Sequence, residues 1–228
     1  MNSNSSLTGG LTVAVLAVAL IISGYGAAIA IGGAGSHVTT STVTTTVTNS
    51  SASSPYVVTL VITTGNTFNS TVGAQPGFYV LGPNGLESSA SIYLPAHRLI
   101  KLVIVNYDEG NASLVIPNDN VVSGTTNGTV FVASNANVNS SQGRSGIVIK
   151  GGQTLTSVPP AILAHTFTVP SLNLNVPVPL SSTVVAYFTV DKAGNYIWFC
   201  ETACGFGSTG TAGAMSTPGW MTGSLVAS

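Results

Sequence analysis

The chain has 228 residues, enough for one domain with a sizeable core and a separate anchor segment. Only 5% of the residues are charged and the net charge is −1, whereas an average soluble protein carries about 25% charged residues. Ser, Thr, Asn and Gly take the place of charged residues, so the expected surface is polar without being ionised. A nucleic-acid-binding protein needs a basic patch, and this composition excludes one.

An apolar segment near the N-terminus predicts a single transmembrane helix over residues 11–34. Leu11 to Ile31 contain no charged residue, and about 20 such residues cross a hydrocarbon core of about 30 Å. A cleaved signal peptide is the competing interpretation, but residues 1–10 lack the Lys or Arg that such a peptide carries. We therefore expect residues 1–10 to be a short cytoplasmic N-terminus.

The second half of the apolar segment is rich in small residues, which let two helix backbones approach closely in lipid. This composition favours a partner helix, and the alternative is a simple tether. The small residues are Ser23, Gly24, Gly26, Ala27, Ala28 and Ala30.

Residues 35–54 are Ser/Thr-rich and predict an extended stalk between the anchor and the following domain. The alternation of Val43 and Val47 with Thr is also compatible with an edge strand.

Most Asn-x-Ser/Thr sequons follow the apolar segment, where an exported domain would be glycosylated. These sequons and a Cys-poor domain indicate a single-pass cell-membrane protein with its N-terminus inside and its C-terminal domain outside. Composition alone is the alternative origin of the sequons. The predicted glycosylation sites are Asn49, Asn69, Asn111, Asn127 and Asn139.

Residues 55–228 predict an all-β domain. Short runs of β-branched and aromatic residues alternate with Gly, Pro and Asn turns, a pattern typical of a β-sandwich or barrel. No stretch shows a helical period. The predicted strands cover residues 56–65, 77–82, 91–95, 97–107, 112–117, 128–134, 145–151, 165–170, 183–190, 195–200 and 222–228.

The last third of the chain contains the candidate metal-binding residues. His165 lies on a predicted strand, a Pro-rich excursion follows, and an aromatic strand ends at Cys200, with Cys204 four residues later. This part resembles the C-terminal part of cupredoxins, most closely the copper-bearing domain of haem–copper oxidase subunit II in its single-helix, archaeal form. The Cys-x-x-x-Cys spacing and the 35 residues from His165 to Cys200 carry the resemblance, which covers roughly residues 90–228.

The resemblance implies a cupredoxin-like Greek-key β-sandwich with a copper site at one pole. The candidate ligands are His165, Cys200, Cys204 and Met215, because electron-transfer copper prefers thiolate, imidazole and a weak thioether. The set is incomplete, since Ser208 and Thr211 stand where the family has a second His and a Met.

Two other states of the cysteines remain open. Cys200 and Cys204 could form a disulfide, which is natural in an oxidising exterior, or remain as buried free thiols. In either case the domain would be metal-free.

The leading functional hypothesis is a subunit II-like, non-catalytic component of a respiratory terminal oxidase. Its helix would dock to the catalytic membrane subunit, which alone would hold haem, and quinol or a small redox protein would donate electrons. One alternative is a membrane-anchored mononuclear blue-copper carrier resembling sulfocyanin. Another is a glycosylated structural surface protein with a metal-free cupredoxin fold.

Overall fold

The computed structural model describes residues 53–110, 116–134, 151–207 and 209–228, all within one compact unit that spans Ser50–Ser228. The predicted transmembrane helix and all but the last two residues of the predicted stalk lie outside the described residues. Among the residues that are described, no helix is long and apolar enough to cross a membrane.

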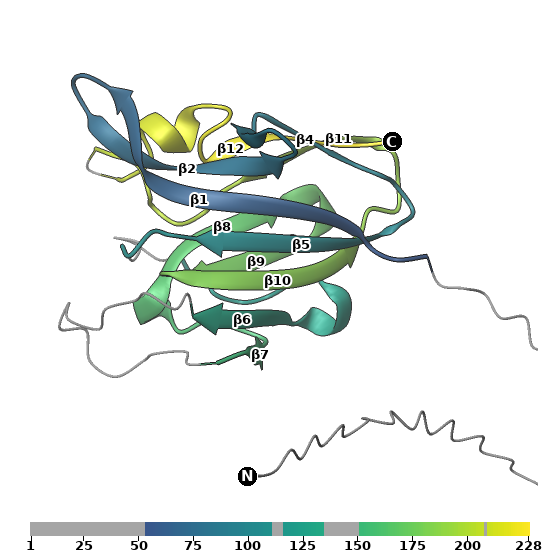
Figure 1. Cartoon of the computed structure of the whole chain (residues 1–228). Coiled ribbons are helices and arrows are strands. Elements are labelled where there is room, and N and C mark those ends of the chain that lie inside the picture. Colours follow the sequence, from purple (N-terminus) through teal and green to yellow (C-terminus); the bar gives the residue numbers. More distant parts are fainter. Residues whose placement is uncertain (1–52, 111–115, 135–150, 208) are drawn as a thin grey trace, which may run out of the picture. The chain divides into compact units, whose positions relative to one another are not determined.

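The described residues form twelve strands and four short 3₁₀ helices (Figure 1). The strands are β1 (Tyr56–Asn69), β2 (Gly73–Gly82), β3 (Gly85–Ser88), β4 (Ser91–Leu94), β5 (Leu99–Asn106), β6 (Val130–Ser134), β7 (Gln153–Leu155), β8 (Leu163–Val169), β9 (Leu174–Pro179), β10 (Ser182–Thr189), β11 (Gly194–Phe199) and β12 (Thr222–Ala227). The 3₁₀ helices are η1 (Thr126–Gly128), η2 (Pro160–Ile162), η3 (Pro170–Leu172) and η4 (Gly213–Ser216).

The strands make two sheets. One has the order β3-β2-β1-β5-β10-β6-β7 and the other the order β4-β12-β11-β8-β9. The pairs β1–β5 and β4–β12 are parallel, and the remaining named pairs are antiparallel. Neighbouring strands that are distant in sequence mark Greek-key crossovers. The predicted all-β Greek-key sandwich is confirmed.

Alternating side chains bring the two sheets together over one core. In β5 the residues Ile100, Leu102 and Ile104 are buried while those between them are partly exposed, as a period of two requires. They join one cluster with residues of the second sheet, including Phe167 and Trp198, whose rings stack with centroids 5.3 Å apart.

The Pro-rich excursion predicted after His165 is wrong. Residues 174–179 are strand β9, buried at every position and paired with β8. Pro177 and Pro179 are tolerated because β9 is the last strand of its sheet. A proline lacks the N–H group for a ladder hydrogen bond, and an edge strand pairs with a neighbouring strand of its sheet on one side only. Strands β3 and β7 were also missed because each is very short.

Two predicted strands lie largely outside the described residues. Of the segment 112–117 only Ile116 and Pro117 are described, and they form a loop. Of the segment 145–151 only Gly151 is described.

Candidate metal centre

The imidazole of His165 lies inside the sandwich. Strand β8 is buried along its whole length, and the alternation of a strand places His165 and Phe167 on the same side. His165 is 1% exposed and packs edge-on against Phe78, with ring centroids 6.0 Å apart. A buried imidazole needs a hydrogen-bond partner at each ring nitrogen.

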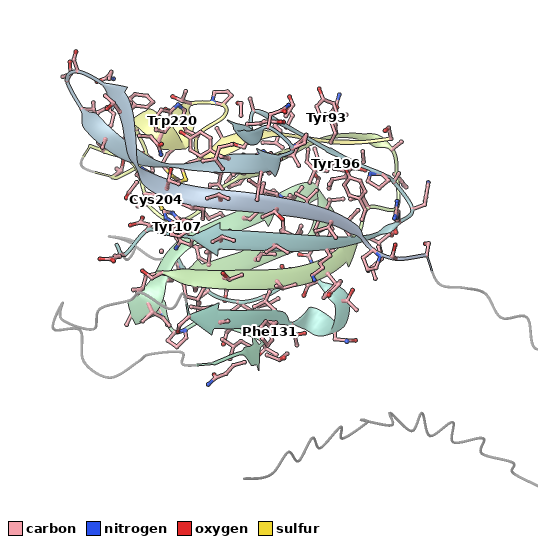
Figure 2. The ribbon with its side chains drawn as sticks, viewed as in Figure 1. Tyr93, Tyr107, Phe131, Tyr196, Cys204 and Trp220 are labelled. Atoms are coloured by element: carbon pink, nitrogen blue, oxygen red, sulfur yellow. The ribbon has the colours of Figure 1, made fainter. Side chains whose placement is uncertain are left out.

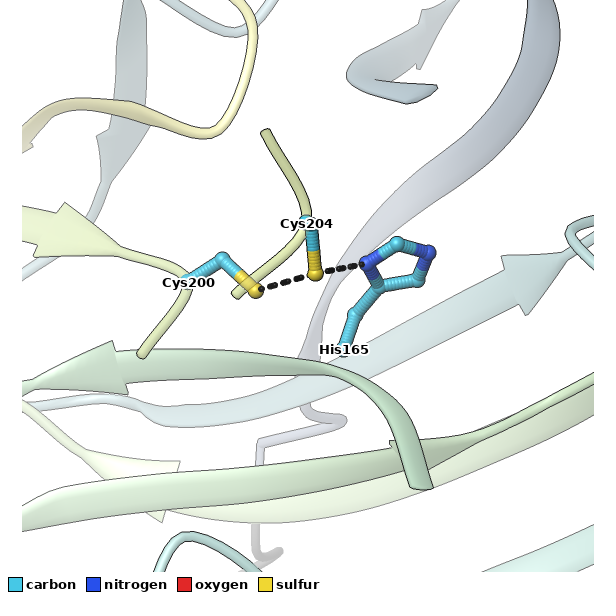
Figure 3. A group of neighbouring side chains, drawn as sticks. All are labelled: His165, Cys200 and Cys204. Carbon is cyan, nitrogen blue, oxygen red and sulfur yellow. Dashed lines mark hydrogen bonds between the residues drawn. The ribbon is translucent and has the colours of Figure 1, made fainter. Parts of the chain in front are cut away.

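The two cysteines lie on one side of this ring. The Nδ1 atom of His165 is 3.0 Å from Sγ of Cys204, and that sulfur is 3.4 Å from Sγ of Cys200 (Figure 3). One donor atom from each of the three residues lies within 4.8 Å of the other two. The structure thus brings together three of the four ligands predicted from sequence.

Antiparallel packing of β11 beside β8 explains this convergence. Phe199 at the end of β11 pairs with Thr168, so the chain after it continues along β8 towards His165. The backbone N–H of Thr166 donates to Sγ of Cys200 at 3.4 Å, and its hydroxyl accepts the N–H of Glu201 at 2.8 Å. These contacts hold the cysteine loop against the strand that carries the histidine.

Thr202, between the cysteines, is fully buried and was not predicted as a site residue. Its hydroxyl donates to the carbonyl oxygen of Ala164 at 3.1 Å and lies 3.1 Å and 3.0 Å from the sulfurs of Cys200 and Cys204. The threonine therefore fixes the separation of both sulfurs from β8.

Asp108 is the second residue that sequence reasoning missed. Its Oδ2 atom lies 2.9 Å from Nε2 of His165, on the side of the ring opposite the sulfurs. In the sequence, Asp108 directly follows the predicted strand over residues 97–107. A carboxylate directly after a strand was the one available signal, and nothing local linked it to a histidine 57 residues later.

These contacts set the charges of the metal-free site. Burial lowers the pKa of His165, but hydrogen bonds and charge from Asp108 and Cys200 outweigh this effect and raise the pKa to about 9. Burial raises the pKa of Asp108, yet the hydrogen bond and charge of His165 leave it below its usual value. At neutral pH the imidazole is therefore a cation beside a carboxylate.

The two thiols differ in acidity. Burial raises the pKa of Cys200, but hydrogen bonds from Cys204 and His165 bring that pKa well below the usual value. The pKa of Cys204 is raised well above its usual value, mainly by its hydrogen bond with Cys200 and to a smaller extent by burial. Cys200 is therefore the more acidic of the two thiols in the metal-free site.

Met215, the fourth predicted ligand, lies in η4, half-buried against the core. A Cβ atom placed on Gly205 would lie 2.9 Å from Cγ of Met215, so this side chain passes close to the residue after Cys204. Met215 and Cys200 also line a cavity of about 780 Å³ together with the carboxyl-bearing residues Asp119 and Glu201. Met215 thus lies close to the loop that carries the two cysteines.

The donor set fits a soft metal ion. Thiolate and imidazole suit copper and zinc, and donors that share one tetrahedral ion lie roughly 3.5 to 4 Å apart. The observed separations of 3.0 Å and 3.4 Å need only a small outward movement. The Nε2 atom is already held by a carboxylate, as is usual for a ligating histidine.

In this structure Cys200 and Cys204 are free thiols. Their sulfurs are 3.4 Å apart, compared with about 2.0 Å in a disulfide. The predicted disulfide remains an alternative for the oxidised protein.

Two predicted glycosylation sites are described, and both are exposed. Asn69 ends β1 at the hairpin before β2, and its Oδ1 atom accepts the N–H groups of Thr71 and Val72. Asn127 lies in η1. Asn49, Asn111 and Asn139 lie outside the described residues.

No known family model matches the chain, and no curated protein sequence matches it. Among solved structures, it is similar to the periplasmic domain of cytochrome oxidase subunit II from Bradyrhizobium japonicum, at 8% identity and a TM-score of 0.32, over 76% of this chain and 83% of that one. It is also similar to auracyanin B, at 11% identity and a TM-score of 0.31, over 77% and 91%. A third is rusticyanin from Thiobacillus ferrooxidans, at 14% identity and a TM-score of 0.31, over 75% and 76%.

Proposed function

We propose that residues 55–228 form a copper-binding electron-transfer domain. The observation that carries this proposal is the convergence of His165, Cys200 and Cys204, with their donor atoms within 4.8 Å at one end of the sandwich. Bound copper would supply the one-electron redox change, and Met215 would provide a weak fourth donor.

The protein's contribution is a largely buried site whose donors are held by hydrogen bonds. His165 and Cys200 are each 1% exposed, and hydrogen bonds tie the cysteine loop to β8 through Thr166 and Thr202. Donors held in this way move little when the oxidation state changes, which favours fast electron transfer.

The same end of the domain offers a surface for a redox partner. Tyr107, which is labelled in Figure 2 and lies next to Asp108 in the chain, is 61% exposed. Phe206, two residues after Cys204, is 42% exposed. Apolar side chains of this kind mark contact sites when they gather at one place. Cys204 is more exposed than Cys200 and gives the shorter route to that surface.

The finer proposal is that the chain is a subunit II-like component of a respiratory terminal oxidase, working at the outer face of the cell membrane. The Cys-x-x-x-Cys spacing, the upstream His165 and the predicted single transmembrane helix support it. The helix would bind the haem-carrying catalytic subunit, and quinol or a small redox protein would supply electrons.

Copper loading of the full chain in mild detergent tests the metal site. Cu(II) bound by thiolate gives an intense visible band, and we expect one equivalent of copper together with this band. Cys200→Ser should abolish the band, and Cys204→Ser should reveal whether the second sulfur is a ligand. A protein with no band, no bound copper and no titratable thiols before reduction would instead contain the disulfide.

Co-purification tests the oxidase proposal separately. Extraction of the native membrane in mild detergent should recover the chain with a large haem-containing subunit. Recovery of the copper-loaded chain alone would favour a free blue-copper carrier, and recovery as a metal-free polymer would favour a structural surface protein.

A further inference from the structure

Asp108 lies next to the group formed by His165, Cys200 and Cys204, and hydrogen bonds fix both its side chain and its backbone. Its Oδ1 atom accepts the N–H of Gly110 at 2.7 Å, while Oδ2 lies 2.9 Å from Nε2 of His165. Its own N–H donates to Oδ1 of Asn106 at 2.9 Å, and its carbonyl oxygen accepts the N–H of Ser181 at 2.8 Å. The carboxylate therefore has one orientation.

This placement decides which nitrogen of His165 is available to a metal. The proton on Nε2 is committed to Asp108, so Nε2 is not a ligand. Nδ1 faces the sulfur of Cys204 at 3.0 Å. Metal binding would replace the proton on Nδ1 and leave the Nε2–H···Oδ2 hydrogen bond intact.

The carboxylate also brings a negative charge close to a buried site that already has two sulfur donors. The side chain of Asp108 is 15% exposed and that of His165 is 1% exposed, so water screens this charge weakly. A negative charge favours the more highly charged state of a nearby ion. For copper, it favours Cu(II) over Cu(I).

We infer that Asp108 is a positioning and tuning residue of the metal centre: it presents Nδ1 of His165 to the metal and lowers the reduction potential of copper bound there. This inference rests on the proposed copper-binding function. It assigns no metal contact to Asp108 itself.

Cadmium binding to the full chain tests the positioning role with a redox-silent ion. Asp108→Ala should weaken Cd²⁺ binding by about 10- to 100-fold, the usual effect of removing such a partner. Asp108→Asn should retain most of the affinity, because its amide oxygen still accepts from Nε2. Asp191→Asn makes the same change of charge in the exposed turn before β11, at the other end of that strand, and should leave affinity unchanged.

Nitrogen NMR of the cadmium-loaded protein shows which ring nitrogen of His165 binds the ion and which one carries the proton. In the wild type, Nδ1 of His165 should couple to ¹¹³Cd and Nε2 should carry a proton. In Asp108→Ala we expect the Nε2 proton to exchange faster with water. Unchanged affinity together with unchanged Nε2 proton exchange in this variant would overturn the positioning role.

The reduction potential of the copper form tests the tuning role. Asp108→Asn should raise the potential, Asp108→Glu should restore it at least in part, and Asp191→Asn should leave it unchanged. Equal potentials in the wild type and Asp108→Asn would overturn this part of the inference. A wild-type chain that binds neither copper nor Cd²⁺ would overturn the proposed function and this inference together. If the wild type binds metal and the Asp108 variants match it in affinity, Nε2 proton exchange and reduction potential, only the inference is overturned.

Discussion

The side chain of Gln75 accepts a hydrogen bond from the backbone N–H of Ala214 at 2.7 Å, across 139 positions of the sequence. Gln75 is 5% exposed and Ala214 is fully buried. Ala214 precedes Met215, and the same loop is held again by an edge-to-face contact between Phe68 and Trp220, with ring centroids 5.0 Å apart. The hairpin of β1 and β2 therefore positions the loop that carries the candidate thioether ligand.

Gln75→Ala should destabilise the protein by about 1–3 kcal/mol, because the buried N–H of Ala214 loses its partner. Urea unfolding followed by circular dichroism measures the change. Gln153→Ala removes the same side chain from an exposed position in β7 and should have almost no effect. Equal unfolding curves for the two variants would contradict this assignment.

Thr202→Val should also destabilise the protein by about 1–3 kcal/mol, because it removes the hydroxyl that bonds the buried carbonyl of Ala164 and lies against both sulfurs. Thr202→Ser keeps the hydroxyl and should lose less. Thr67→Val makes the same substitution at an exposed position and serves as the control. A fully stable Thr202→Val protein would show that the hydroxyl is dispensable.

Met215→Leu should raise the reduction potential of the copper form and shift its visible band if the thioether binds the metal, since a lost donor stabilises Cu(II) less. Voltammetry and absorption spectroscopy measure both effects. Met221→Leu is the matched control, because Met221 is fully buried in the core and this substitution nearly conserves volume. Identical spectra for wild type and Met215→Leu would remove Met215 from the ligand set.

In the metal-free protein the imidazole of His165 should remain protonated up to a pH of about 9. Its folded pKa exceeds the value of about 6.5 for an unfolded chain, so its contribution to stability is complete below pH 6.5 and disappears as the pH rises through 9. Cys200, whose pKa is lowered, contributes a slope of opposite sign. The free energy of unfolding should therefore change little between about pH 6.5 and 8.5.

NMR titration of the imidazole, assigned with His165→Gln, measures the pKa of His165 directly. Urea unfolding between about pH 6.5 and 8.5 measures whether the opposite contributions of His165 and Cys200 to the free energy of unfolding cancel. Asp108→Asn should lower the pKa of His165. A histidine that titrates near 6.5 in the wild type would contradict the ion pair with Asp108.

Much of the fold follows from local sequence patterns. Alternation with a period of two places β5 and β10, because burying one face of a strand is a local requirement on its residues. Strand β9 was not predicted because prolines are unfavourable within a strand. They are acceptable here because β9 lies at the edge of its sheet.

The sequence alone determined the all-β class of the domain and the chemical identity of the candidate ligands His165, Cys200 and Cys204, because residue type and short spacing are properties of the chain itself. Tertiary structure alone decided that Asp108 holds the far side of the imidazole, that Thr202 spaces the sulfurs and that Gln75 anchors the loop of Met215. Those contacts join residues up to 139 positions apart. They depend on which strands become neighbours, and strand pairing is set by burial of the whole core rather than by any local pattern.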